Sequence, residues 1–178
     1  MKFHETKPEN LARAENKRLE HCPEETVMED EDFLARFEAA AFPIDEWHHR
    51  EHIKAAYLYL CRYPFEIALE RMRASIQALN AAHHVPESPT RGYHETTTQA
   101  WLRLVHTTLC EYGASVNADQ FYEEHPELSQ KKLLRLFYSR ELLQSPQLKG
   151  EFVEPDLATL PKAKGSARMD SKPRRITA

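Results

Sequence analysis

The chain has 178 residues, 4 of them glycine, and a formal net charge of −4. This length suits one domain with a real core and is short for two. The mild negative charge argues against nucleic acid as a general partner. Scarce glycine together with abundant Ala, Leu, Glu and Arg predicts an all-α fold, because sheets need more turns and more β-branched residues.

Both ends of the chain are polar. Residues 1–28 carry charges of both signs, and we expect a polar, partly disordered N-terminal segment without a signal-peptide stretch. Residues 161–178 hold six basic residues against one acid and predict a disordered basic tail. No apolar run reaches about 18 residues, so we expect a cytoplasmic protein without membrane contact. The three widely spaced cysteines do not resemble a disulfide framework, and we expect Cys61 and Cys110 to be buried in helices.

The helical domain is predicted over residues 29–160. Four main helices are expected at 31–42, 46–63, 64–83 and 93–112, with shorter ones near 118–125, 128–137 and 139–149. Pro64 suits the first turn of the third helix, Gly113 the end of the fourth, and Ser139 the N-cap of the last. We therefore predict an up-down bundle of about four to five main helices followed by shorter C-terminal helices.

The stretch WHHREH at residues 47–52 places three histidines at the start of the second helix. At 100° per residue, His49 falls inside the apolar stripe, His52 lies at its flank and His48 lies further out. Arg50 and Glu51 face the other way, so this is not the HExxH arrangement of zinc proteases. The spacing of three residues between His49 and His52 can bring two imidazoles to one ion.

The fourth helix supplies a third candidate, His94, which falls inside its apolar stripe, upstream of Trp101. In an up-down bundle the second and fourth helices run parallel, so we expect His49, His52 and His94 to meet at one end of the bundle. Three imidazoles with an open position would suit a divalent ion such as zinc, iron or nickel. Glu95 is the candidate catalytic carboxylate, although it lies off the stripe.

Three further side chains could join such a site: His48, Glu38 from the first helix, and the Tyr138 phenol. The leading hypothesis is a mononuclear metalloenzyme that acts on a small molecule as a hydrolase, transferase or oxygenase. The alternative is a non-catalytic helical interaction module, in which the histidines form a buried polar layer.

Three stretches, HHREH, YHETTTQAW and FVEPDLATLP, resemble a group of small bacterial helical proteins with no assigned activity. The resemblance covers residues 30–161 and implies no catalytic residues. In outline the sequence is also similar to the DinB-like helical bundles, which hold a metal with three histidines. Their histidine pair is HxxxH on a late helix, whereas here the pair comes early and the single histidine later. The similarity therefore concerns architecture alone.

Overall fold

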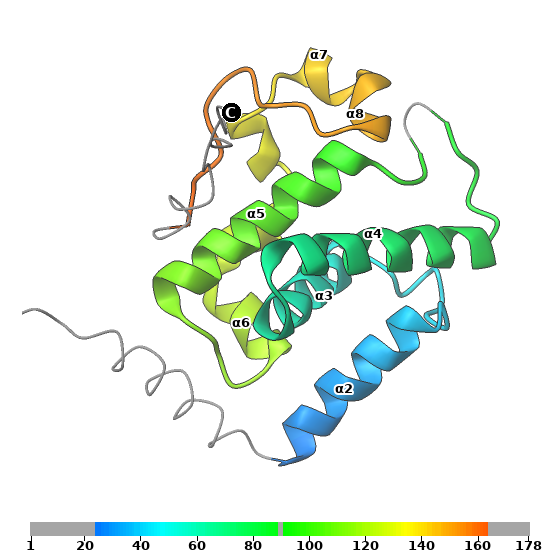
Figure 1. Ribbon diagram of the computed structural model, residues 1–178, viewed down its shortest axis with the longest axis vertical. Helices are drawn as coiled ribbons and strands as arrows, with labels where there is room; N and C mark the ends of the chain where they lie inside the picture. The colour runs from blue at the N-terminus through cyan, green and yellow to red at the C-terminus, as the bar shows by residue number, and fades with distance from the viewer. Residues whose placement is uncertain (1–23, 89–90, 164–178) are drawn as a thin grey trace, which may run out of the picture.

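The computed structural model describes residues 24–88 and 91–163, with the backbone alone for residues 24–28. This part of the chain is all-α, as predicted, and contains no strand (Figure 1). Most of the predicted tail and most of the predicted N-terminal segment lie outside the described residues. The main helices are α2 (Glu24–Glu38), α3 (His49–Arg62), α4 (Phe65–Ala82), α5 (Glu95–Tyr112) and α6 (Ala118–Glu124). Two 3₁₀ helices follow, η1 (Pro126–Ser129) and η2 (Leu133–Leu136), and then α7 (Arg140–Leu143) and α8 (Gln147–Gly150).

Helix α3 is the centre of the domain. Its middle, from Ile53 to Leu60, is buried at every position except Lys54. Helices α2, α4, α5 and α6 all pack against it, as the arrangement in Figure 1 shows. A helix that is apolar on nearly all sides is stable in water only when other elements cover it. The apolar surface of α3 therefore determines where the neighbouring helices pack.

Helix α2 differs from the prediction at both ends. It begins at Glu24 and ends at Glu38, whereas the sequence predicted residues 31–42. Ala40 has a left-handed φ of 52°, and the Ala41 N–H donates to the Arg36 carbonyl, which closes the helix before Phe42. Pro43 disfavours helical backbone at the residue before it, and this gives a physical reason for the earlier end.

The other main helices begin and end close to the predicted positions. Gly113 terminates α5 with φ of 87°, and its N–H donates to the Leu109 carbonyl. Ser139 caps α7 by accepting the Leu142 N–H at 3.1 Å, as predicted. Pro64 precedes α4 as its N-cap, one position before the expected one.

The C-terminal part of the domain is broken into short turns instead of two regular helices. Pro126 opens η1 between two of the predicted helices, whereas Pro146 precedes α8 and interrupts the helix predicted over residues 139–149. Tyr138 is completely buried, and its hydroxyl donates to the Val153 carbonyl at 3.0 Å. This bond holds the segment after α8 against the core.

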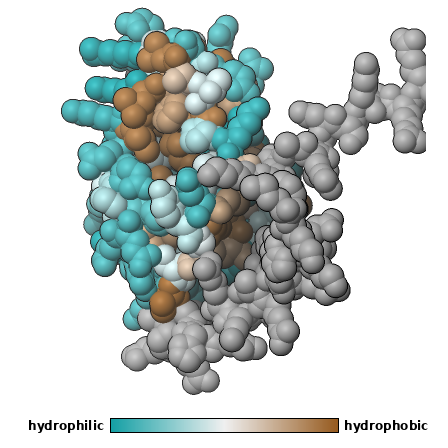
Figure 2. Space-filling view, turned by 90° about the vertical axis from the view of Figure 1, so that its left-hand side faces the viewer, coloured by the Kyte–Doolittle hydropathy of each residue, from teal (hydrophilic) through white to brown (hydrophobic). Residues whose placement is uncertain are grey.

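The surface in Figure 2 is mostly hydrophilic, with a hydrophobic area at the height of α7 and α8.

Both described cysteines, Cys61 and Cys110, are free and exposed, so the expectation that they are buried was wrong. Among the described residues, none of the helices combines the length and the hydropathy that a membrane crossing needs.

Candidate functional site

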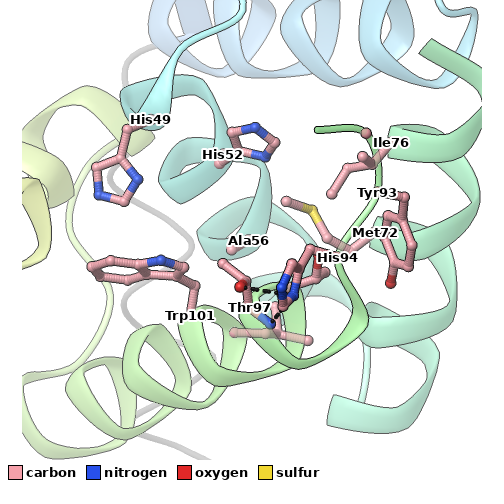
Figure 3. A pocket seen from close by; sticks show the side chains of 12 residues that line it. His49, His52, Ala56, Met72, Ile76, Tyr93, His94, Thr97 and Trp101 are labelled. Atoms are coloured by element: carbon pink, nitrogen blue, oxygen red, sulfur yellow. Dashed lines mark hydrogen bonds between the residues drawn. The ribbon is translucent and has the colours of Figure 1, made fainter. Parts of the chain in front are cut away.

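A cavity of about 200 Å³ lies between the start of α3, the middle of α4 and the first half of α5. Figure 3 shows the side chains around it. The histidines among them come from α3 and from the N-cap of α5. The residues that line it are His49, His52, Ala56, Met72, Ile76, Gly92, Tyr93, His94, Thr97, Thr98, Trp101 and Leu102. Within residues 24–88 and 91–163, no Asp, Glu, Lys or Arg lines the cavity.

His49 is the first residue of α3, and its side chain lies between the cavity and a hydrogen-bond partner in η1. Its Nε2 lies 2.8 Å from the Leu128 carbonyl oxygen. Its ring meets the Trp101 indole edge to face, with 4.5 Å between centroids. Burial lowers the pKa of His49, and the positive charge of Lys131 lowers it further, although the bond to Leu128 partly opposes both. The ring is therefore neutral at pH 7.

His52 lies one turn further along α3. Burial lowers its pKa to about 4, with smaller contributions from His49 and Lys131. The ring packs against the Trp47 indole, with 4.9 Å between centroids. Within the described part of the chain, the His52 ring nitrogens have no hydrogen-bond partner. His52 thus brings a neutral ring with unused hydrogen-bonding capacity to the cavity.

His94 caps the N-terminus of α5. Its Nδ1 accepts the Thr97 backbone N–H at 3.3 Å and lies 3.0 Å from the Thr97 hydroxyl (Figure 3). Burial is the main reason that the pKa of His94 is lowered, and the charge of Lys149 contributes. A histidine here performs the role that Ser, Thr, Asp and Asn usually have, and its ring also reaches the cavity.

The turn before α5 places Tyr93 and His94 at the cavity. Gly92 has φ of 90°, a conformation that side-chain-bearing residues rarely adopt. A Cβ at this position would also collide with the Glu87 carboxylate. That carboxylate accepts the Tyr93 N–H at 2.8 Å and an N–H from Lys149 at 2.7 Å. The backbone angle therefore favours glycine at this turn, and a side chain here would also push the Glu87 carboxylate out of these bonds.

All three predicted histidine ligands line this one cavity. However, among residues 24–88 and 91–163 no group of three or more His, Cys, Asp or Glu side chains is placed to hold a metal ion. The bonds of His49 to Leu128 and of His94 to Thr97 are of the kind that a buried polar layer would contain. The structure therefore brings the histidines together without arranging their nitrogens around one point.

The four other candidates do not line the cavity. Glu95 is buried, and Arg73 holds it with two bonds of 2.6 and 2.8 Å while the Tyr93 hydroxyl donates at 2.7 Å. Glu38 is exposed and pairs with Arg71, and Tyr138 is bonded to Val153. His48 is exposed and precedes α3 as its N-cap. A catalytic role for Glu95 stays a prediction.

The sequence analysis missed the wall that α4 contributes. Met72 and Ile76 lie four residues apart on the buried face of this helix, and both line the cavity. Their spacing was visible in the sequence, but apolar residues at such a spacing usually indicate core packing. Thr97 was also missed, because only the nearby His94 carried a recognisable signal.

A comparison with protein-family models, with curated proteins and with solved structures found no match to this chain.

Proposed function

We propose that this protein binds a small organic molecule in the cavity between α3, α4 and α5. The observation that carries the proposal is that three histidines from two different helices share one cavity. The remaining walls are largely apolar, with Met72, Ile76 and Trp101 among them. Ligand sites in proteins typically combine such walls with a few polar groups that fix the orientation of the ligand.

The size of the cavity limits the ligand. An apolar cavity of about 150 Å³ in another protein admits benzene. A volume of about 200 Å³ therefore suits a molecule of about six to ten non-hydrogen atoms. Such a molecule is a single ring with one or two substituents, or a short chain.

The neutral state of the histidines permits chemistry as well as binding. A neutral imidazole can accept a proton from a bound molecule and later return it, which is general acid–base catalysis. Burial lowers the pKa of His49 and of His52, so both rings are available in this form at pH 7. The catalytic version of the proposal is a proton transfer on the bound small molecule.

The test is a screen of single-ring fragments by methyl NMR on the full chain. We expect binders to shift the methyl signals of Met72, Ile76 and Ala56, which lie in the cavity wall. Ala56→Leu fills part of the cavity and should abolish these shifts, while circular dichroism checks that the helices remain. A screen in which no fragment shifts these methyls, or in which Ala56→Leu binds as well as the parent, contradicts the proposal.

Metal binding is a second candidate, favoured by one specific observation. His49 has one ring nitrogen on a carbonyl oxygen, the arrangement that commonly orients a metal-ligating histidine. Its other nitrogen would then be free for a divalent ion such as zinc, iron or nickel, with His52 one turn away on the same helix. His94 would have to contribute its Nε2 or release Thr97, because its Nδ1 accepts the helix-capping bond.

The metal content of the protein tests this second candidate. The chain is purified without a histidine tag, and bound metals are measured by mass spectrometry for the parent, His49→Ala and His94→Ala. One equivalent of metal in the parent that is lost in both variants supports a metal site. His48→Ala is the control, because His48 is exposed and does not line the cavity. A metal-free parent that also fails to take up added zinc or cobalt contradicts this candidate.

A further inference from the structure

The hydrogen bonds of His94 determine which of its ring nitrogens carries the proton. Nδ1 accepts a backbone N–H, so in the neutral ring the proton must be on Nε2. Nδ1 is fully used by the Thr97 N–H and hydroxyl, and only Nε2 is left to serve the cavity. His94 therefore offers a hydrogen-bond donor to a ligand.

His49 carries its proton on the same ring nitrogen as His94, but in His49 the protonated nitrogen is the one that is already used. Its Nε2 faces the Leu128 carbonyl oxygen, which can only accept, so Nε2 carries the proton. The other nitrogen, Nδ1, then has an unprotonated lone pair. Figure 3 shows the His49 ring at the cavity, next to Trp101. His49 therefore offers a hydrogen-bond acceptor, and it does so from a different helix than His94.

The lining restricts the charge and shape of the ligand. Among the described residues no acidic or basic side chain lines the cavity, so an ion there would have no direct ion-pair partner, and its desolvation would be costly. Trp101 and Met72 lie on different sides of the cavity in Figure 3. An indole face and a thioether both make favourable contacts with a flat aromatic ring.

We infer that the ligand is an uncharged, flat ring compound with a hydrogen-bond acceptor for His94 and a donor for His49, as in a lactam or a pyridone. This inference rests on the proposed function and adds the chemical class of the ligand. His52, whose ring has no partner among the described residues, can adopt either tautomer and adapt to a further substituent.

Four probes of similar size test the inference. 4-Pyridone has an N–H donor and a C=O acceptor at opposite ends, whereas 4-pyranone has the same shape and lacks the donor. Toluene has neither group, and benzoate is charged. Dissociation constants are measured with the full chain by calorimetry. We expect 4-pyridone to bind about tenfold more tightly than each of the others, because each of them leaves a buried polar group unpaired or a charge uncompensated.

Two variants assign the effect to the cavity. Ser is a good N-cap, so His94→Ser keeps the start of α5 and removes the Nε2 donor. We expect this variant to bind 4-pyridone about tenfold more weakly than the parent. His106→Gln is the control on the same helix, because His106 does not line the cavity, and its affinity should equal that of the parent.

The outcomes separate the inference from the proposed function. If toluene binds as tightly as 4-pyridone, the cavity binds small molecules and the inferred ligand class is wrong. The same holds if 4-pyranone matches 4-pyridone or if His94→Ser binds normally. If none of the four probes binds, the inferred ligand class is wrong, and the fragment screen described above decides separately whether the cavity binds a small molecule. The comparison of 4-pyridone with 4-pyranone needs no variant and decides the question even if His94→Ser does not fold.

Discussion

His94 and Glu95 are neighbours in the chain, but they belong to two different environments. His94 lines the cavity, where a ring nitrogen remains for a ligand. Glu95 turns about 100° away and is buried against α4, where Arg73 and Tyr93 occupy its oxygens. The difference teaches that the start of α5 is fixed on one side by a fully paired carboxylate. Because the Glu95 pair holds the start of α5 in place, the cavity side of the same turn can keep polar groups that have no partner.

The cavity side should lose stability in acid, and His52 should account for the largest effect. Its pKa is about 4 in the folded state and about 6.5 in the unfolded chain. Between these values the unfolded chain binds the proton first, so the free energy of unfolding decreases as the pH falls from about 6.5 to 4. A shift of this size corresponds to about 3 kcal/mol. Above pH 6.5 the neutral His52 ring costs the folded state nothing, and below pH about 4 His52 causes no further decrease in the free energy of unfolding.

Urea titrations at several pH values measure this decrease. His52→Gln should remove most of the pH dependence between 4 and 6.5, because Gln does not titrate. His48→Gln is the matched control, since His48 lies four residues away and is exposed. If His52→Gln and His48→Gln follow the same pH profile, the cavity is not the origin of the acid sensitivity.

The Glu95 side should respond most strongly to the loss of Arg73. Arg73→Met leaves a carboxylate that is only 8% exposed without its cation, and we expect a loss of about 2 kcal/mol. Loss of a fully buried partner costs more, but the Arg73 side chain is 37% exposed and water screens the pair. The pKa of Glu95, which Arg73 lowers, should rise in the variant.

Denaturation in urea with a matched control checks this estimate. Arg62→Met removes a guanidinium from an ion pair with Glu31, whose side chain is 57% exposed, and should cost less than about 1 kcal/mol. Equal losses in Arg73→Met and Arg62→Met would mean that the Glu95 pair does not hold α5 in place.

Much of the fold followed from the sequence because the deciding signals are local. Pro64 and Gly113 delimit α4 and α5 near the predicted residues, and Ser139 caps α7 as expected. The end of α2 did not follow, because the apolar residues after Glu38 continue the helical pattern. The left-handed turn at Ala40 replaces that continuation. Local pattern alone did not reveal where the helix closes.

The site followed in part, for a physical reason. A rotation of 100° per residue places His49 and His94 on the inward faces of their helices and Glu95 away from them, as the structure has it. Such a rotation does not give the side-chain rotamers, so it could not foresee the bonds to Leu128 and Thr97. It also could not foresee the α4 wall, which depends on how three helices pack.

Thr96 extends the comparison to a third side of the same helix turn. Its hydroxyl donates to the Glu151 carbonyl at 2.7 Å and accepts the Val153 N–H at 3.1 Å, which ties the segment after α8 to α5. Thr96→Val keeps the shape and leaves both backbone groups without this partner, so we expect a loss of about 1.5 kcal/mol.

Thermal and urea unfolding measure the loss in Thr96→Val. The control is Thr108→Val, because the Thr108 hydroxyl donates only to the Leu104 carbonyl within α5 and its removal should have little effect. A loss in Thr96→Val no greater than in Thr108→Val would mean that the segment after α8 is held by apolar contacts alone.

The smallest effect separates the two roles of His94, the cap of α5 and the cavity wall. His94→Ala removes the acceptor of the Thr97 N–H, and we expect a loss of about 1 kcal/mol, whereas His94→Ser keeps a capping oxygen and should lose about half as much or less. Urea denaturation gives both values, and 4-pyridone binding should be weakened equally in the two variants, because both lack Nε2. Stability would then differ between the variants while affinity would not. If instead affinity followed stability, the imidazole would matter to the ligand only through the cap, and the two sides of this helix turn would not be independent.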